Sequence, residues 1–223
     1  MSALVFIGGG GHGRACLEAA RSAGLTVTGF IDRDSRANMQ GAPWLGDDDW
    51  LRQATDGQRF LITVGQVKSA AIRVRLYDQL KALGLPLAAL VAGSAVVSPW
   101  ATLGEGCAVL HHALVNAGAD VGANCIINSG ALVEHDAVIG AHSHVATGAI
   151  VNGGARVGSR CLVGTRAVVL QGVTVADDVV IGAGAVVTAD IEEAGTWVGV
   201  PARRLETAVD IHAEAGPGQS PAQ

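Results

Sequence analysis

An aliphatic residue recurs at every sixth position from residue 91 to residue 187, without an insertion anywhere. Small residues, mostly Ala or Cys, form a second column two positions before the aliphatic one. Because residues two apart point to the same side of a strand, both columns can fill one interior. The pattern therefore predicts short strands joined by tight turns, with the aliphatic column at Val91, Val97, Leu103, Val109, Val115, Val121, Ile127, Val133 and their successors.

Three such units would close a triangular coil of about eighteen residues, and stacked coils would pair their strands in parallel. Gly, Asn and Asp, which are frequent after the aliphatic residues, tolerate the unusual conformations of the turns. The alternative, a parallel α/β sheet, needs helical patterns between its strands, and this region has none. We therefore predict an all-β parallel β-helix over residues 91–205, with flat apolar sides that favour a closed assembly of identical copies.

Residues 1–90 show a different pattern, in which apolar strands alternate with helical segments. Strands are predicted at residues 4–7, 26–31 and 60–64, and helices at residues 14–23 and 68–83. This alternation favours a small parallel sheet flanked by helices, and so a Rossmann-like α/β half domain. The last segment, residues 206–223, is rich in Gly, Pro and Ala, which predicts a flexible C-terminal tail.

A glycine-rich loop, GGGGHG at residues 8–13, follows the first predicted strand. It satisfies the G-x-G-x-x-G spacing, and Asp32 lies at about the distance expected of a ribose-binding acid. Read literally, the loop predicts NAD binding, but the unit has room for only half of a dinucleotide fold. A mononucleotide site with backbone amides near a phosphate, and a tight strand–helix turn without a ligand, both stay open.

Composition narrows the class of protein. Only 16% of the residues are charged and the net charge is -5, so the clustered Lys and Arg of a nucleic-acid-binding protein are not expected. No apolar run approaches the length of a membrane span, which predicts a cytoplasmic protein without membrane insertion. Cys107, Cys125 and Cys161 fall in the small-residue column, which indicates buried filler in place of disulfides or a metal site.

Five motifs spread over residues 3–205 carry a family resemblance. They are GGGGHG (8–13), FID (30–32), TVG (63–65), NSGALVEHDAVIGAHSHVATGA (128–149) and VGVPARR (198–204). Together they resemble the bacterial nucleotide-sugar N-acetyltransferases, which acetylate 4-amino sugars on UDP or GDP carriers and have sialic acid O-acetyltransferases as close relatives. The resemblance implies a left-handed β-helix, acetyl-CoA as co-substrate without a metal, and a homotrimer with active sites between subunits.

His135 is the candidate general base. Acetyl transfer from a thioester to an amine needs a group that removes a proton as the nitrogen attacks, and neutral imidazole has a suitable pKa. The residues one coil away, Ala117 and Gly153, are small and leave open space beside it. In a catalytic role, Asp136 or, less favourably, Glu134 would orient the ring. Spacing alone is equally consistent with an exposed corner histidine that has no catalytic role. The resemblance implies the base at His135 and its acid partner at Asp136, where the family usually has Glu.

The resemblance also implies positions that bind the ligands. It places His144 near the acetyl-CoA thioester, and Gly153 and Thr165 along the pantetheine. His144 is nine residues from His135, on the opposite side of one coil, so a site that uses both must lie between subunits. Asn128 could bind substrate or cap a coil. The nucleotide-sugar positions implied by the family are Gly10, Gly11, His12, Asp32, Arg33, Gly65 and Gln66.

The sequence thus predicts an acetyl-CoA-dependent N-acetyltransferase acting on a nucleotide-linked 4-amino sugar in bacterial glycan biosynthesis, by direct transfer. Two alternatives stay open. O-acetylation of a sugar hydroxyl would use the same geometry, and a catalytically idle β-helix could serve as an assembly scaffold. The intact segment Glu134-His135-Asp136 argues against the scaffold.

Overall fold

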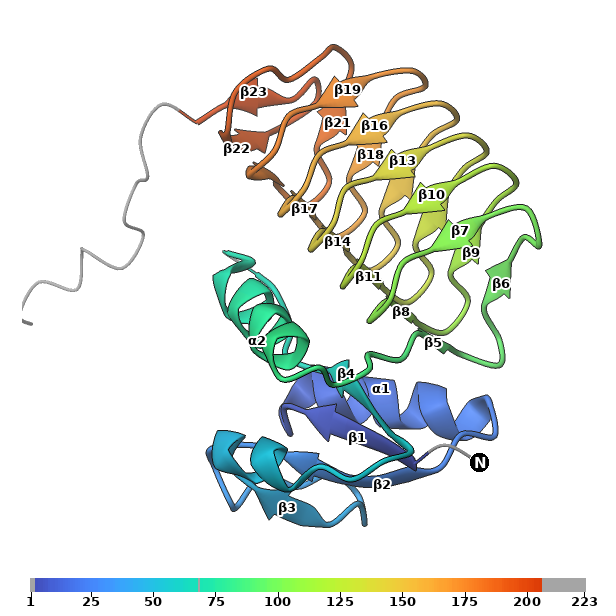
Figure 1. Ribbon diagram of the computed structural model, residues 1–223. Helices are drawn as coiled ribbons and strands as arrows, with labels where there is room; N and C mark the ends of the chain where they lie inside the picture. The colour runs from blue at the N-terminus through green and yellow to red at the C-terminus, as the bar shows by residue number, and fades with distance from the viewer. Residues whose placement is uncertain (1–2, 68, 206–223) are drawn as a thin grey trace, which may run out of the picture.

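The computed structural model describes residues 3–67 and 69–205, which form an α/β unit followed by a coiled stack of strands (Figure 1). The predicted C-terminal tail, residues 206–223, lies outside the described residues. Within the described ranges no helix has the length and apolar character needed to cross a lipid bilayer.

The N-terminal unit is a four-stranded parallel sheet with the strand order β3-β2-β1-β4. Each predicted strand and helix is present, with ends shifted by a few residues. The short elements β3 and η1 were not predicted, because neither shows a regular alternation of apolar and polar residues. The elements are β1 (Ala3–Ile7), α1 (Gly11–Ser22), β2 (Val27–Ile31), β3 (Trp44–Gly46), the 3-10 helix η1 (Asp48–Gln53), β4 (Gln58–Ile62) and α2 (Ala71–Ala82).

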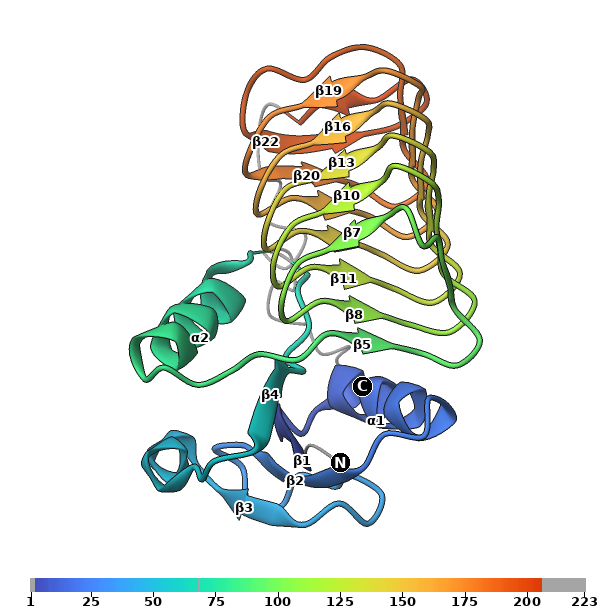
Figure 2. The same ribbon diagram turned by 45° about the vertical axis from the view of Figure 1, so that its right-hand side comes forward.

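Successive residues of β1 face opposite sides of this sheet, as the period of a strand requires. Phe6 packs with Leu17 of α1, whereas Val5 packs with Leu76 of α2. The cluster that contains Phe6 also contains Leu90, the first strand residue of the coiled stack. Helix α1 therefore lies between the sheet and the first coils (Figure 2), and the two units share part of one apolar core.

The rest of the chain winds into a parallel β-helix with three sides. Strands one coil apart pair with partners eighteen residues away, as in Val121 with Ile139 and Val133 with Val151, which confirms the predicted register. The first side contains β7 (Thr102–Leu103), β10 (Asp120–Val121), β13 (Val138–Ile139), β16 (Arg156–Val157) and β19 (Thr174–Val175). The second contains β5 (Leu90–Val91), β8 (Ala108–Val109), β11 (Ile126–Ile127), β14 (His144–Val145), β17 (Leu162–Val163), β20 (Val179–Ile181), β22 (Gly195–Val198) and β23 (Arg203–Arg204). The third contains β6 (Val96–Val97), β9 (Leu114–Val115), β12 (Leu132–Val133), β15 (Ile150–Val151), β18 (Val168–Val169) and β21 (Val186–Val187).

The three sides present different residues outward. On the first, which we call the polar side, Asp120 and Arg156 are exposed. The second is the docked side, because the N-terminal unit packs against its first coils; Ala108 lies in the shared cluster, and Ile126, one coil above, is also completely buried. The third is the apolar side, whose outward residues are all aliphatic and all at least partly exposed: Val96, Leu114, Leu132, Ile150, Val168 and Val186.

The interior is filled by the two predicted columns. Val133 and Ile139 of the aliphatic column, and Ala131 of the small-residue column, are almost entirely removed from solvent. The cysteines are free and buried, and Cys125 and Cys161 stand in the small-residue column as predicted. No sulfur is therefore exposed to act as a nucleophile at the surface of the described chain.

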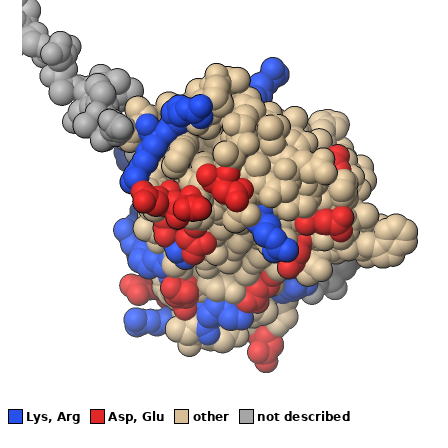
Figure 3. Space-filling view, turned by 90° about the horizontal axis from the view of Figure 1, so that it is seen from above, with Lys and Arg blue, Asp and Glu red and all other residues tan. Residues whose placement is uncertain are grey.

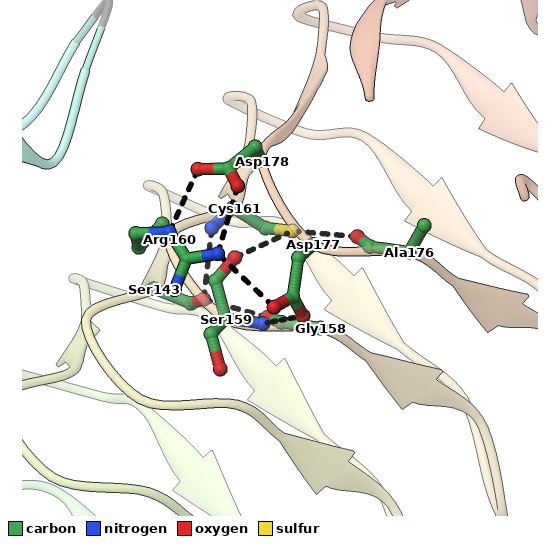
Figure 4. A network of polar contacts seen from close by, with 8 residues as sticks. All are labelled: Ser143, Gly158, Ser159, Arg160, Cys161, Ala176, Asp177 and Asp178. Atoms are coloured by element: carbon green, nitrogen blue, oxygen red, sulfur yellow. Dashed lines mark hydrogen bonds and ion pairs between the residues drawn. The ribbon is translucent and has the colours of Figure 1, made fainter. Parts of the chain in front are cut away.

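Polar contacts tie successive coils together at the corner between the polar and docked sides (Figure 4). Arg160 pairs with Asp177 at 3.1 Å and with Asp178 at 2.8 Å, both in the next coil. Ser143 Oγ accepts a hydrogen bond of 2.9 Å from the Cys161 N–H. Exposed ion pairs of this kind contribute about 0–1 kcal/mol each, so the apolar columns provide most of the stacking energy.

Charged side chains of both signs gather at the end of the stack that is seen from above (Figure 3). Arg204 pairs there with Glu193, and Asp190 and Glu192 lie beside them around a shallow pocket. On the face shown, acidic and basic side chains lie next to one another, and much of the remaining surface is uncharged. Nucleic acids bind to continuous basic surfaces, which this face does not present.

Candidate active site

His135 lies in the turn between β12 and β13, at the corner where the apolar side meets the polar side. Its Nδ1 is 3.0 Å from Asp136 Oδ2, and the side chain is 57% exposed. A carboxylate at Nδ1 selects the tautomer that carries its proton there, so Nε2 is left as the free, basic nitrogen. The hydrogen bond to Asp136 raises the pKa of His135 above its usual value. We call His135, Asp136 and Gly153 the base corner.

Asp136 adopts a left-handed backbone conformation that glycine adopts in the three coils stacked on it at this corner. Its φ is +59°, and the residues stacked on it at this corner, Gly118, Gly154 and Gly172, have φ values of +71°, +67° and +70°. The left-handed region costs a non-glycine residue about 1–2 kcal/mol. Asp tolerates this region better than most residues do, and Asn124 and Asp178 adopt it at another corner of the stack. The strained backbone here directs a carboxylate at the imidazole.

Glu134, the alternative partner considered for His135, is engaged elsewhere. Its Oε2 accepts hydrogen bonds from Asn116 Nδ2 at 2.8 Å and from the His135 N–H at 3.1 Å. Asp136, and not Glu134, therefore orients the imidazole. Asn116 was missed by the sequence analysis, although it stands one coil below Glu134 and could have been found by subtracting eighteen.

Gly153 lies directly against the His135 ring. A Cβ at this position would stand 2.5 Å from His135 Nε2, whereas a Cβ at Gly154 would meet nothing within 4 Å. Gly153 does not have a positive φ, but Gly154 does. Gly153 therefore leaves space for the His135 ring, whereas Gly154 allows the backbone to form the turn.

This difference predicts that alanine at Gly153 affects catalysis and that alanine at Gly154 affects stability. Gly153→Ala should displace the imidazole and lower kcat by at least about 10-fold, since small misplacements at a reacting centre are costly, with little change in Tm. Gly154→Ala should keep kcat within about 2-fold but destabilise the fold by about 1–2 kcal/mol. Steady-state kinetics and thermal melts of both proteins measure this, and equal kcat values in the two variants would contradict it.

A second group of predicted residues lines a pocket of about 280 Å³ between the N-terminal unit and the docked side. We call it the interunit pocket; it includes Gln66, Asn128, His144 and Thr165. His144 Nδ1 lies 2.9 Å from the Gln66 carbonyl oxygen, so it donates there, and Nε2 accepts from Asn128 Nδ2 at 3.0 Å. Burial, with a smaller contribution from the charge of Arg73, lowers the pKa of His144 to about 4. His144 is therefore neutral at physiological pH.

Two further polar groups in the interunit pocket bear on the predicted roles. Asn128 Oδ1 accepts from the Ser129 N–H at 2.8 Å, so Asn128 caps its turn as well as contacting His144. Gln66 Nε2 donates to the Cys161 carbonyl at 3.1 Å, but its buried Oε1 has no hydrogen-bond partner within the described residues. A buried acceptor at a pocket wall is available to a donor on a ligand.

A third site lies at the carboxyl ends of β1, β2 and β4. This sheet-edge pocket, of about 210 Å³, includes Asp32, Arg33, Asp48 and Val64. Open parallel sheets bind their ligands at this edge. Both Asp32 oxygens already accept backbone N–H groups, Oδ2 from Gly9 at 2.6 Å and Oδ1 from Asp34 at 2.9 Å, so Asp32 also shapes the glycine loop.

The remaining predicted residues line neither pocket. Gly10 is exposed and Gly11 begins α1, while Gly65 lies against His12. The ring of His12 is 6.5 Å from that of His144, and its Nε2 is 3.5 Å from Cys16 Sγ. Burial, together with the charge of Arg73, lowers the pKa of His12 to about 3. His12 is thus a neutral residue beside the interunit pocket.

Apart from these glycines and His12, the predicted residues fall into three places on one chain: the base corner, the interunit pocket and the sheet-edge pocket. His135 and His144 are separated by the whole polar side, since β13 lies between them. Gly153 stands with His135 and not with Thr165. Within residues 3–67 and 69–205, no three His, Cys, Asp or Glu side chains lie close enough to hold a metal ion.

Comparison with known proteins identifies the class. Residues 3–80 match the model of the PglD N-terminal domain, and residues 154–189 match the hexapeptide repeat of succinyl-transferase. A search of curated proteins gave no match.

Solved structures give matches over most of the chain. The acetyltransferase domain of PglB from Neisseria gonorrhoeae FA1090 is 33% identical, with a TM-score of 0.86 over 92% of this chain and 100% of that one. PerB from Caulobacter crescentus, in complex with CoA and GDP-perosamine, is 36% identical, with a TM-score of 0.84 over 92% of this chain and 98% of that one. WeeI from Acinetobacter baumannii AYE is 25% identical, with a TM-score of 0.76 over 92% and 100%.

The fold and these matches define an acetyltransferase of the hexapeptide-repeat class. More narrowly, the chain belongs to the bacterial sugar N-acetyltransferases that join a PglD N-terminal domain to a left-handed β-helix. The predicted family, enzyme class and fold class are confirmed.

Proposed function

We propose that this enzyme transfers the acetyl group of acetyl-CoA to the amine of a 4-amino sugar carried on UDP or GDP. The observation that carries the proposal is the exposed His135. Asp136 holds its ring in the tautomer with a basic Nε2, and Gly153 leaves the space that the ring occupies. The relatives support the substrate class, since PerB was solved with CoA and GDP-perosamine and the gonococcal PglB domain with acetyl coenzyme A. A non-catalytic scaffold would have no need of an exposed imidazole paired with a carboxylate.

The two units divide the binding between them in this proposal. The sheet-edge pocket of residues 1–90 holds the nucleotide, near Asp32 and Arg33, with the glycine loop facing the phosphates. The interunit pocket of residues 91–205 and Gln66 holds the acetyl-donor arm, along His144 and Thr165. Because that pocket is mostly apolar and partly enclosed, it suits the pantetheine chain.

We further propose that the enzyme is a homotrimer that builds each active site from two subunits. The apolar side supports this, because its outward column is aliphatic from Val96 to Val186 and Val96 is 60% exposed. Exposed apolar surfaces of this regularity favour burial against copies of the same chain. The base corner borders the apolar side, so assembly would bring it to a neighbour. His135 of one subunit and His144 of its neighbour would then belong to one active site, although they lie apart within one chain.

The proposed chemistry is direct transfer. Neutral His135 Nε2 takes a proton from the sugar amine as the amine nitrogen attacks the thioester carbonyl. The C–S bond then breaks, and the CoA thiolate that leaves takes up a proton from the imidazolium or from water. Asp136 stabilises the imidazolium that forms. The buried cysteines support a mechanism without an acyl-enzyme, and most of the rate enhancement would come from holding two substrates in line.

The pH dependence follows from the charge on Asp136. If His135 acts as the base, kcat/KM should rise with pH through the ionisation of its imidazole. Because Asp136 raises the pKa of His135, Asp136→Asn should move that rising limb to lower pH and lower the maximal rate less than loss of the imidazole does. Rate profiles between pH 5 and 9 test this. A limb that stays in place would assign it to another group.

The function itself is tested by measuring release of the CoA thiol with a panel of UDP- and GDP-linked amino sugars. We expect turnover with a 4-amino sugar and none with the matching 4-hydroxy sugar. Turnover of the hydroxy sugars alone would favour O-acetylation, and no thiol release with any acceptor would contradict the proposal. Mass spectrometry of the product identifies the acetylated atom.

A further inference from the structure

Helix α2 contains a buried arginine that has no acidic partner. Arg73 is 1% exposed, and none of the ion pairs of the described chain includes it. Burial lowers the pKa of Arg73 to about 10, so it remains protonated at neutral pH. Since a buried cation is costly without a counter-ion, an apolar residue would serve the core better. Its presence requires a reason other than packing.

The guanidinium joins the two units. Its Nη1 donates to the carbonyls of Ile62 at 3.0 Å and Val64 at 2.7 Å, where β4 ends. Its Nη2 donates to Asn124 of the β-helix, to the backbone oxygen at 2.9 Å and to Oδ1 at 2.6 Å. Asn124 Nδ2 returns a bond of 3.2 Å to the Arg73 carbonyl. Arg73 therefore clamps the end of β4 to a corner of the β-helix.

The segment that begins at this clamp, residues 64–67, forms part of both pockets. Val64 lines the sheet-edge pocket, whereas Gln66 and Val67 line the interunit pocket. The Gln66 carbonyl also holds His144 Nδ1, and so sets the tautomer of that ring. A ligand that displaces this segment in one pocket therefore also moves residues that line the other pocket.

We infer that Arg73 is a positioning residue that couples the two pockets, because it fixes the Ile62 and Val64 carbonyls, at the start of residues 64–67, to Asn124 of the β-helix. The inference rests on the proposed function, since it takes the two ligands to be a nucleoside diphosphate and CoA. A ligand in one pocket orders the segment, and the second ligand then binds to a segment that is already ordered. Such coupling is reciprocal, so each ligand strengthens the other by the same factor.

Calorimetry measures this coupling without turnover. The Kd of CoA is determined alone and with saturating GDP or UDP, for the wild-type protein and two variants. Arg73→Lys keeps the charge but cannot reach β4 and Asn124 together. Asn124→Gly keeps Arg73 and its bond to the backbone oxygen of residue 124 but removes both bonds of the Asn124 side chain to Arg73. Glycine suits the φ of +55° at this position, as Gly106 shows one coil below. In the wild type the nucleotide should tighten CoA binding at least about 5-fold. Arg73→Lys should bring this ratio close to 1, and Asn124→Gly, which keeps one bond, should lower it clearly below the wild-type value.

Asp178→Gly is the matched control, because Asp178 occupies the same corner column with a φ of +58° and does not contact Arg73. It should keep the wild-type ratio. If Arg73→Lys does not fold, Asn124→Gly alone decides the question. A wild-type ratio near 1, or an unchanged ratio in a folded Asn124→Gly protein, would overturn the inference and leave Arg73 structural. Failure of the wild type to bind CoA at all would instead contradict the proposed function.

Discussion

His135→Ala is expected to lower kcat by about 10²–10⁴-fold, the usual contribution of a general base. The KM values should change little, because the imidazole is proposed to act chiefly in the transition state. The fold should persist, since the side chain is 57% exposed and the residue stacked beside it is Gly153. Steady-state kinetics on the acceptor identified in the substrate panel measure the effect, with circular dichroism and sedimentation to verify the fold and assembly.

Two comparisons make this test specific. The rising limb of the pH profile should disappear in His135→Ala, because the group that titrates has been removed. His112→Asn is a control at an exposed corner histidine with a φ of +60°, outside the base corner and both pockets, and it should keep wild-type kinetics. Near-normal turnover by a folded His135→Ala protein would make His135 an ordinary corner residue.

The β-helix could be predicted almost completely from the sequence because its register is periodic. Once Val121 and Ile139 are known to be one coil apart, every other pair follows, and the structure confirms that spacing. The same arithmetic placed Gly153 beside His135, and the ring does lie against it. In this half of the chain, residues in contact between coils are separated by a fixed number of positions, so the sequence alone gives the contact partners.

The N-terminal unit offered no such offset. Nothing in the segment around Arg73 distinguishes a buried arginine from a solvated one, because its acceptors are carbonyl groups and an Asn from a distant coil. Asp32 fitted a ribose-binding position by spacing, yet its oxygens are engaged by Gly9 and Asp34. Contacts that depend on how two units dock are absent from any one-dimensional pattern.

Mixed trimers are expected to recover activity from two chains that are each inactive. His135→Ala removes the base and keeps the interunit pocket, whereas Thr165→Trp fills that pocket at an exposed residue and keeps the base corner. Suppose that each site combines the base corner of one subunit with the interunit pocket of its neighbour. In a trimer with both chain types, one of the three interfaces then joins an intact base corner to an intact pocket. Activity should therefore reach about one third of the wild-type value per trimer.

The experiment uses two affinity tags, so that only trimers containing both chains are purified and assayed. Loss of CoA binding by the Thr165→Trp homotrimer verifies that its pocket is blocked, and sedimentation verifies a mass of three chains. As a control, Leu132→Glu on the apolar side should prevent assembly, because it would bury a charge in the proposed interface; activity should be lost although His135 is intact. Mixed trimers without activity would mean that each site belongs to a single chain, and a fully active Leu132→Glu monomer would mean the same. Recovery near one third, together with an inactive monomer, requires that the base and the acetyl donor come from different subunits.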